Sequence, residues 1–152
     1  LETMWTGAGT RRSNPVAGPE NPLAPPVQFY GCDDGSVRAE VTLGPVYQGP
    51  PGCVHGGISA LIIDHMMGFA NHWGGRFGMT AHYEIDYRSP TPLLEPLSFR
   101  AWVQEREGRK TWTHATIHAG ERLCVEARGL FLEASVPVPG QPGTESMLGD
   151  GA

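Results

Sequence analysis

Positive charge is scarce in this sequence. Its 152 residues contain 11 lysines and arginines against 16 aspartates and glutamates, which gives a formal net charge of −5. Domains that bind nucleic acid carry a basic stripe or patch, and no segment of this chain supplies one. The composition therefore argues against a nucleic-acid partner, although a few local cations could still hold a phosphorylated small molecule.

Long apolar runs and paired cysteines are also missing. No apolar stretch reaches the length that spans a bilayer, and no signal-peptide pattern opens the sequence. The three cysteines, Cys32, Cys53 and Cys124, form neither a CxxC motif nor an even disulfide framework. We therefore expect no membrane partner, free thiols and a cytoplasmic location.

The length suits one domain with a sizeable hydrophobic core. The 21 glycines and 14 prolines cluster towards the ends and in one loop. We predict an irregular, proline-rich N-terminal arm at residues 1–26, one folded domain at 27–135 and a disordered tail at 136–152.

The segment Val54–Trp73 predicts one long helix. Apolar residues recur at helical spacing on one face, and the other face is apolar too, which is typical of a buried helix. The segment has a single carboxylate, Asp64, and no lysine or arginine. Burying an unpaired carboxylate costs several kcal/mol or shifts its pKa, so Asp64 is a candidate functional residue. The alternative is a structural aspartate that is bonded to a neighbouring backbone group or serine.

Alternating segments around this helix predict strands. They lie at residues 27–32, 36–43, 79–88, 97–106, 110–119 and 123–133. One antiparallel sheet wrapped around one helix satisfies this order, which is an α+β fold. Because the helix is apolar nearly all round, we expect that the sheet curls around it or that a second subunit covers it.

Strict alternation within 79–88 makes a further prediction about side-chain direction. It places Thr80 on the opposite face from a set of apolar and small residues, namely Met79, Ala81, Tyr83, Ile85 and Tyr87.

His55, Gly56 and Gly57 open the helix. Glycines allow a substrate to approach the backbone closely, and the first N–H groups of a helix suit a developing oxyanion. His55 and Asp64 are nine residues apart, which is about 13 Å along a helix axis. They cannot hold the same small atom within one chain. If both are catalytic, the enzyme is at least a dimer with a shared site.

Two motifs, GPPGCVHGGISALIID and MTAHYEIDYRSPTPL, resemble those of the hotdog-fold acyl-CoA thioesterases of the phenylacetate-pathway (PaaI-like) type. The resemblance covers about Val37 to Ala134. It implies a curved antiparallel sheet wrapped around one long central helix, and hydrolysis of an acyl-CoA thioester to free coenzyme A and a carboxylic acid. It also implies no metal or other cofactor, and a homodimer or homotetramer with the active site at the subunit interface.

The same resemblance implies roles for single residues. Asp64 matches the catalytic carboxylate, acting as general base or as nucleophile. The Gly56 N–H matches the group that polarises the thioester carbonyl, His55 orders the loop and the substrate, and Thr80 positions water. A further set falls where relatives contact coenzyme A: Asp86, Arg88, Arg109, Lys110 and Thr111.

One position departs from the family pattern. Many relatives carry an asparagine six residues before the motif histidine, and this chain has Gly49 there, with Gln48 beside it. The second contact to the thioester carbonyl is therefore left open.

Other functions remain possible from the sequence. A hotdog enoyl-CoA hydratase would need an aspartate–histidine dyad placed differently. A non-catalytic acyl-CoA or acyl-carrier binding protein would keep the cations Arg88, Arg109 and Lys110 but would not need Asp64. A thioesterase that acts on a carrier-protein thioester would share the same motifs. The three cations can also be ordinary solvated residues at strand edges.

Overall fold

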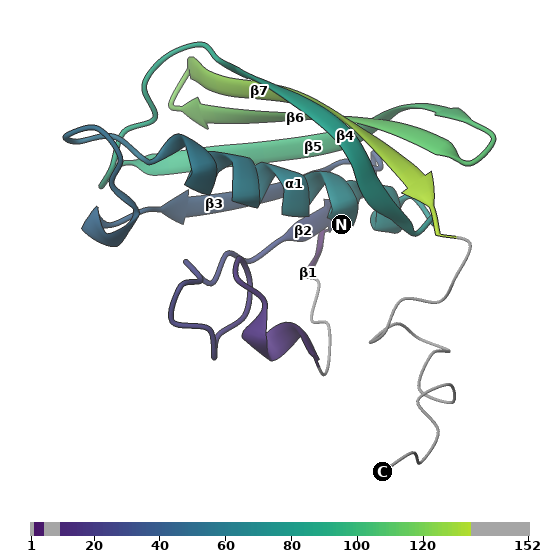
Figure 1. Cartoon of the computed structure of the whole chain (residues 1–152), viewed down its shortest axis with the longest axis horizontal. Coiled ribbons are helices and arrows are strands. Elements are labelled where there is room, and N and C mark those ends of the chain that lie inside the picture. The colour runs from purple at the N-terminus through teal and green to yellow at the C-terminus, as the bar shows by residue number, and fades with distance from the viewer. Residues whose placement is uncertain (1, 5–9, 135–152) are drawn as a thin grey trace.

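The computed structural model describes residues 2–4 and 10–134 of the chain (Figure 1). Within them, seven strands form one antiparallel sheet in the order β1-β2-β3-β5-β6-β7-β4. The strands are β1 (Glu2–Met4), β2 (Tyr30–Cys32), β3 (Val37–Thr42), β4 (Gly78–Tyr87), β5 (Pro96–Glu107), β6 (Lys110–Ala119) and β7 (Arg122–Glu133).

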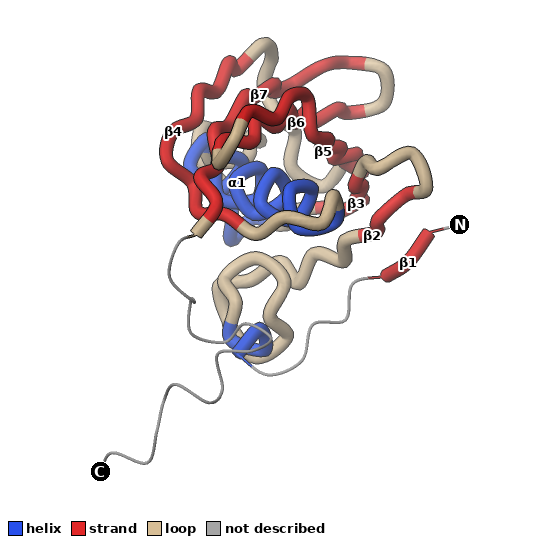
Figure 2. The backbone as a smooth tube through the Cα atoms, turned by 90° about the vertical axis from the view of Figure 1, so that its right-hand side faces the viewer, coloured by secondary structure: helices blue, strands red, loops and turns tan. Residues whose placement is uncertain are grey.

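One helix, α1 (Gly56–Trp73), lies against this sheet. Figure 2 shows the strands β3, β5, β6, β7 and β4, in this sheet order, in an arc around α1. The predicted α+β arrangement of one curved sheet and one long helix is therefore confirmed. The helix begins two residues later than predicted because the backbone of His55 is still extended, with φ −59° and ψ 132°.

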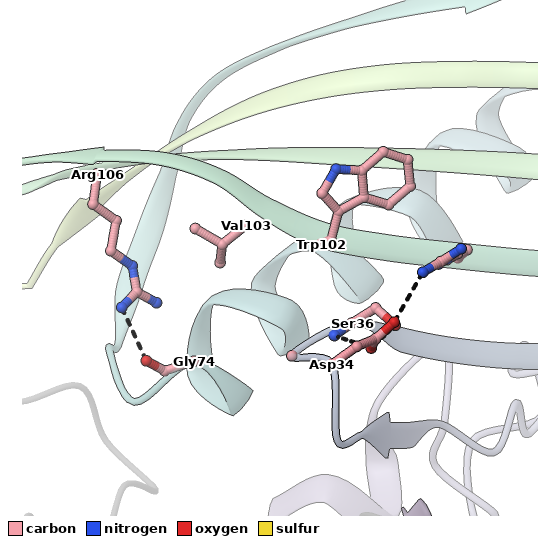
Figure 3. A pocket seen from close by; sticks show the side chains of 8 residues that line it. Asp34, Ser36, Gly74, Trp102, Val103 and Arg106 are labelled. Atoms are coloured by element: carbon pink, nitrogen blue, oxygen red, sulfur yellow. Dashed lines mark hydrogen bonds and ion pairs between the residues drawn. The ribbon is translucent and has the colours of Figure 1, made fainter.

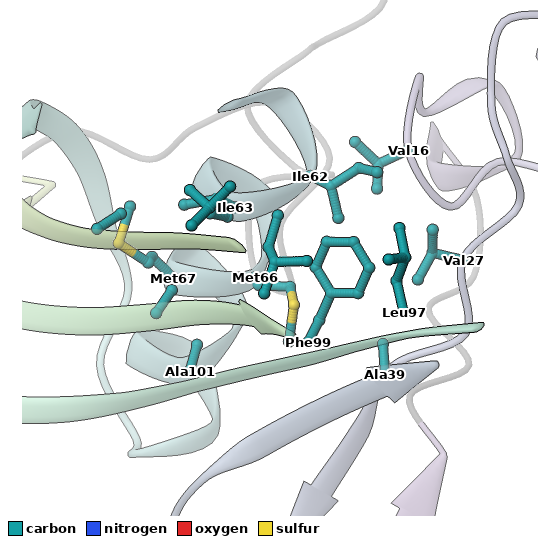
Figure 4. Close-up of a cluster of buried hydrophobic side chains, with 14 of the residues drawn as sticks. Val16, Val27, Ala39, Ile62, Ile63, Met66, Met67, Leu97, Phe99 and Ala101 are labelled. Carbon is teal, nitrogen blue, oxygen red and sulfur yellow. The ribbon is translucent and has the colours of Figure 1, made fainter. Parts of the chain in front are cut away.

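The core fills the space between α1 and the sheet. Ile62, Ile63, Met66 and Met67 point from the helix towards Phe99 and its neighbours on β5 (Figure 4). Burying large apolar side chains contributes about 1.5–3 kcal/mol each. This face of α1 therefore fixes the position of the helix on the sheet.

The opposite face of α1 is only partly covered. Leu61, Asp64, His65 and Gly68 are half-buried, and His72 is exposed. The described part of one chain therefore does not bury the helix on all sides, and the face that carries Asp64 is the one left partly open.

A β-bulge interrupts β4. Thr80 lies opposite Phe131 of β7, and His82 lies opposite the adjacent Leu130, so Ala81 is the extra residue. The bulge shifts the alternation by one position, and Thr80 thereby shares the inward face of Tyr83. The prediction that Thr80 faces away from Tyr83 is wrong for this reason.

The segment predicted as an N-terminal arm includes two short elements among its described residues, 2–4 and 10–26. Strand β1 pairs with β2, and a short 3-10 helix, η1 (Thr10–Ser13), follows. Val16 and Ala24 are buried. The tail predicted at 136–152 lies outside the described residues, and the domain boundaries stay a prediction. Among residues 2–4 and 10–134, no helix is long and apolar enough to cross a membrane.

Candidate active site

Asp64 and Thr80 meet between the helix and the sheet edge. The Thr80 hydroxyl donates a hydrogen bond of 2.8 Å to Oδ1 of Asp64. Asp64 is half-buried, and its partner comes from β4 rather than from its own helix. Asp64 thus has a hydroxyl partner of the kind that the structural alternative expected, but it comes from another element of the fold. The bond orients the carboxylate and uses one of its two oxygens.

A cavity of about 410 Å³ opens beside this pair. Such a volume lies within the range of small-molecule sites. It is lined by residues of α1, of the loop before β4, of the start of β4 and of β7: Asp64, His65, Gly68, Phe69, His72, Phe77, Gly78, Met79, Thr80 and Phe131. A carboxylate and a hydroxyl therefore stand at one end of a mainly apolar slot.

His55 caps the helix start. Its Nδ1 accepts a hydrogen bond of 2.9 Å from the Gly57 N–H, which places the proton of the neutral imidazole on Nε2. Among the described residues, the Gly56 N–H has no acceptor outside the helix. The cap therefore uses one of the first N–H groups and leaves that of Gly56 for a ligand.

Tyr87, at the far end of β4 from Thr80, contacts the start of α1. Its hydroxyl donates a hydrogen bond of 2.8 Å to the Gly56 carbonyl. Burial, and to a lesser degree the nearby Tyr83, raise the pKa of Tyr87, so the phenol stays protonated and can donate. The sequence placed Tyr87 only on one face of a strand, because a contact between residues 31 apart leaves no local signal.

The loop before the helix explains the departure at Gly49. A Cβ at this position would lie 2.7 Å from the His55 Cα, so a side chain does not fit there. The neighbouring Gln48 accepts a hydrogen bond of 3.1 Å from the Gly52 N–H through Oε1. The side-chain amide oxygen of Gln48 thus stabilises this loop.

Arg88 is paired with two carboxylates. Its guanidinium donates to Glu126 at 2.6 Å and to Asp86 at 3.2 Å. The hydrogen bond from Arg88 lowers the pKa of Glu126. A phosphate at Arg88 would therefore compete with these carboxylates for the guanidinium.

The other predicted contacts to coenzyme A lie at the opposite end of the sheet. Arg109 donates to the Glu133 carbonyl at 3.0 Å, and Lys110 is exposed. The Thr111 side chain is buried on the core face, at 2% exposure, and is not available to a ligand. Lys110 is aligned through Leu132 of β7 with Met79, about 30 Å along β4 from Arg88. Within one chain, these cations cannot hold the same phosphate.

A second cavity, of about 630 Å³, lies beside Gly74 at the C-terminal end of α1 (Figure 3). Arg100 pairs with Asp34 at 3.1 Å, and Arg106 donates to the Gly74 carbonyl at 2.9 Å. None of the predicted site residues lines this cavity. Among the described residues, no cluster of three or more His, Cys, Asp or Glu has the arrangement of a metal site.

Comparison with known sequences identifies the family of the motifs. The family model described as "Thioesterase superfamily" matches residues 51–126. The acyl-coenzyme A thioesterase THEM4 of Rattus norvegicus is 38% identical over 94 residues, which cover 60% of this chain and 40% of the rat protein. THEM4 of Xenopus laevis is 37% identical over 107 residues, which cover 69% of this chain and 48% of that protein. The chain thus spans less than half the length of these relatives.

Solved structures share the fold. A crystal structure of a thioesterase superfamily protein aligns with a TM-score of 0.79 and 52% identity, over 85% of this chain and 64% of that chain. Zebra fish thioesterase superfamily member 2 has a TM-score of 0.65 and 19% identity, over 71% and 81%. A Streptococcus mutans protein bound to acetyl CoA has a TM-score of 0.63 and 16% identity, over 66% and 82%. The last two show the fold alone, and together the three confirm the predicted hotdog architecture.

Proposed function

The chain belongs to the thioesterase superfamily, and we propose that it hydrolyses the thioester bond of an acyl-coenzyme A. The observation that carries this proposal is the hydrogen bond of 2.8 Å between Thr80 and Asp64 at one end of the 410 Å³ cavity. Relatives named acyl-coenzyme A thioesterase support coenzyme A as the carrier. The structural neighbour bound to acetyl CoA supports it further.

The chemistry needs a base or nucleophile, a donor for the carbonyl oxygen, and water. Thr80 occupies one oxygen of Asp64. The other oxygen takes a proton from the attacking water or itself attacks the carbonyl carbon. In both routes the C–S bond breaks, and the thiolate of coenzyme A leaves and is protonated. The base route gives the carboxylic acid directly, whereas the nucleophilic route gives a mixed anhydride of Asp64, which a water molecule then cleaves to the carboxylic acid and free Asp64. No metal or redox cofactor takes part in this proposal.

The donor for the carbonyl oxygen is the Gly56 N–H. Within one helix it lies eight residues from Asp64, about 12 Å along the axis. One thioester cannot touch both groups of the same chain. We therefore propose a homodimer, or a dimer of dimers, in which Asp64 of one copy works with Gly56 of the other.

Strand β4 supports this arrangement. It is an edge strand of ten residues, and Met79 and Tyr87 on it are 59% and 55% exposed. Long exposed edges favour pairing with another strand. Two β4 strands paired antiparallel about a two-fold axis place the Tyr87 end of one copy beside the Thr80 end of the other. Tyr87 holds Gly56, and Thr80 holds Asp64, so the two halves of the site meet.

The same pairing bears on the cations. It brings Arg88 of one copy towards Arg109 and Lys110 of the other, since they lie at opposite ends of β4 within one chain. Phosphates of one coenzyme A could then contact both groups. The three free cysteines fit a reducing compartment, and we propose a cytoplasmic location.

Thiol release from a panel of acyl-CoAs, with short, long and aromatic acyl groups, tests the activity. The wild type is expected to hydrolyse at least one ester, and Asp64→Asn to lose at least about 100-fold in kcat while it still binds substrate. Asparagine keeps the shape and can still accept from Thr80, so the variant isolates the charge. Absence of hydrolysis for every ester, or a variant as fast as the wild type, would contradict the proposal.

A single turnover in ¹⁸O-labelled water separates the two routes. A general base delivers the label to the carboxylic acid in the first turnover. A nucleophilic Asp64 forms a mixed anhydride, and water that cleaves it at the Asp64 carboxyl carbon leaves an unlabelled oxygen in the acid and the label in Asp64, which mass spectrometry of the Asp64 peptide detects.

A further inference from the structure

The glycine in the middle of α1 has no packing reason to be a glycine. Gly68 lies inside a helix, where glycine is less favourable than alanine. A Cβ there would meet only Phe131, at 3.6 Å, which is ordinary van der Waals contact. At two other glycines a Cβ would collide, with Trp73 at 2.3 Å for Gly31 and with Met67 at 2.9 Å for Gly129. Close packing therefore explains those two positions and not Gly68.

Gly68 does line the cavity that begins at Asp64. Asp64, Gly68 and His72 follow each other at four-residue spacing, so they lie on one stripe of the helix. Its apolar lining includes Phe77 and Phe131, and Phe131 lies close to Gly68, 3.6 Å from where a Cβ would be. A side chain longer than alanine at position 68 would extend beside Phe131 and narrow the slot at this point.

We propose that this slot takes the acyl group of the substrate and that Gly68 sets how long this group can be. The proposal rests on the thioesterase activity proposed above and names its substrate class. From Asp64 to His72 the stripe extends about 12 Å, at ~1.5 Å per residue. An extended carbon chain advances by roughly 1.3 Å per carbon, because bonded carbons are ~1.5 Å apart and the chain zigzags. The slot therefore suits a medium-chain acyl group of roughly eight to ten carbons.

The position of Gly68 predicts where a larger residue would stop the chain. It lies four residues from Asp64, about 6 Å along the axis. A leucine there leaves room for roughly four carbons beyond the thioester. Acetyl and butyryl groups end before this point, whereas an octanoyl group must pass it.

The test compares kcat/KM for acetyl-, butyryl-, octanoyl- and hexadecanoyl-CoA. The wild type is expected to prefer octanoyl-CoA, and Gly68→Leu to lower the octanoyl-to-acetyl ratio at least tenfold. Gly44→Leu is the matched control, because Gly44 has an ordinary φ of −88° and no atom lies within 4 Å of its Cβ. This control is expected to keep the wild-type ratio. An unchanged ratio in Gly68→Leu, or a wild type that prefers hexadecanoyl-CoA, would overturn the proposal.

Gly68→Ala keeps the test decisive if the leucine variant is unstable. Alanine improves the helix and is expected to raise Tm by about 2–4 °C. It should also lower the octanoyl-to-acetyl ratio, by a smaller factor than leucine. A lower Tm would mean that Gly68 serves packing, and a higher Tm with an unchanged ratio would mean that the slot is not the acyl site.

Binding separates this proposal from the activity itself. The probe is the non-hydrolysable thioether analogue of octanoyl-CoA, with coenzyme A as the reference. Gly68→Leu is expected to raise the Kd of the analogue at least tenfold more than that of coenzyme A. If no ester is hydrolysed but this difference appears, the acyl-binding slot is supported and the proposed hydrolysis is contradicted. If hydrolysis occurs and the difference does not appear, the hydrolysis is supported and the acyl-binding slot is contradicted.

Discussion

Asp64 has a partner that its own helix could not provide. The hydroxyl of Thr80, sixteen residues later in the chain, reaches it from the edge strand and fixes one carboxylate oxygen. A carboxylate that is held by one neutral hydrogen bond keeps an oxygen available for water or for the thioester carbon. The reactive geometry at this position therefore depends on a single hydroxyl.

Removing that hydroxyl gives a graded prediction. Thr80→Val keeps the shape and deletes the donor, so kcat should fall roughly tenfold, as expected for one hydrogen bond of about 1.4 kcal/mol. Thr80→Ser keeps the donor and should stay within about threefold of the wild type. Steady-state thiol release measures both variants, and equal losses in valine and serine would rule out the hydroxyl as the cause.

Arg88 and Glu126 predict an acid-sensitive contact. The pKa of Glu126 is lowered by its hydrogen bond from Arg88, so the stabilisation is complete above the ordinary pKa of a glutamate. It is lost as the pH falls through the lowered pKa of the folded state. Glu126→Gln should therefore be less stable than the wild type at neutral pH, and this gap should close in acid.

Urea unfolding at a series of pH values measures the gap. Glu121→Gln, in the exposed turn between β6 and β7, serves as the control and should show no such pH-dependent difference. A gap for Glu126→Gln that stays constant down to strongly acidic pH would contradict the assignment.

The sequence located Asp64, His55, Gly56 and Thr80, and the structure brings Asp64 and Thr80 together. The sequence could not show that Arg88 is already paired, because its partner Glu126 lies 38 residues away on another strand. It also could not show that the Thr111 side chain is buried. Such features depend on which strands become neighbours, and local patterns carry no record of this.

Strand β4 is the element on which the site depends most. Its bulge at Ala81 allows Thr80 and Tyr87, at an odd separation of seven residues, to face the same side. Thr80 then reaches Asp64, and Tyr87 reaches the Gly56 carbonyl. A regular strand of the same sequence would turn one of them outward.

Moving the hydroxyl by one position tests the bulge. The double variant Thr80→Val with Ala81→Thr restores a threonine where strict alternation would point it inward. Because Ala81 is the bulged residue, the double variant should be as slow as Thr80→Val alone. Recovery of the wild-type kcat in thiol-release assays would mean that the strand is regular.

Alternation and helical periodicity predicted the long elements well. The helix and the strands β4 to β7 lie within a few residues of their predicted bounds, because a one-sided core imposes a clear pattern on them. Strand β1 was not predicted, since its three residues owe their extended form to pairing with β2. The bulge was not predicted either, since one extra residue does not change the composition of the strand.

Three features of the described chain are not satisfied within a single copy. The face of α1 that carries Asp64 is only half-covered, and the long strand β4 forms an open edge. Asp64 and the Gly56 N–H also lie about 12 Å apart on one helix. A two-fold pair of chains resolves all three features at once. The central claim is therefore that Asp64 and Gly56 act on one thioester from two copies.

Two variants disable the two halves of the site separately. Asp64→Asn removes the carboxylate charge. Gly56→Pro removes the N–H donor at the first helical position, where proline is well accepted, and the extended backbone of His55 suits a following proline. Gly56→Ala is the control, because it adds a Cβ near the Tyr87 hydroxyl but keeps the N–H.

The decisive measurement is thiol release by mixed dimers, co-expressed with two different tags and purified through both. Each homodimer, Asp64→Asn or Gly56→Pro, should be nearly inactive. A mixed dimer holds one site with both intact groups, so it should show about half of the wild-type activity. Mixed dimers that stay as inactive as the two parents, beside an active wild type, would contradict a site shared between two chains.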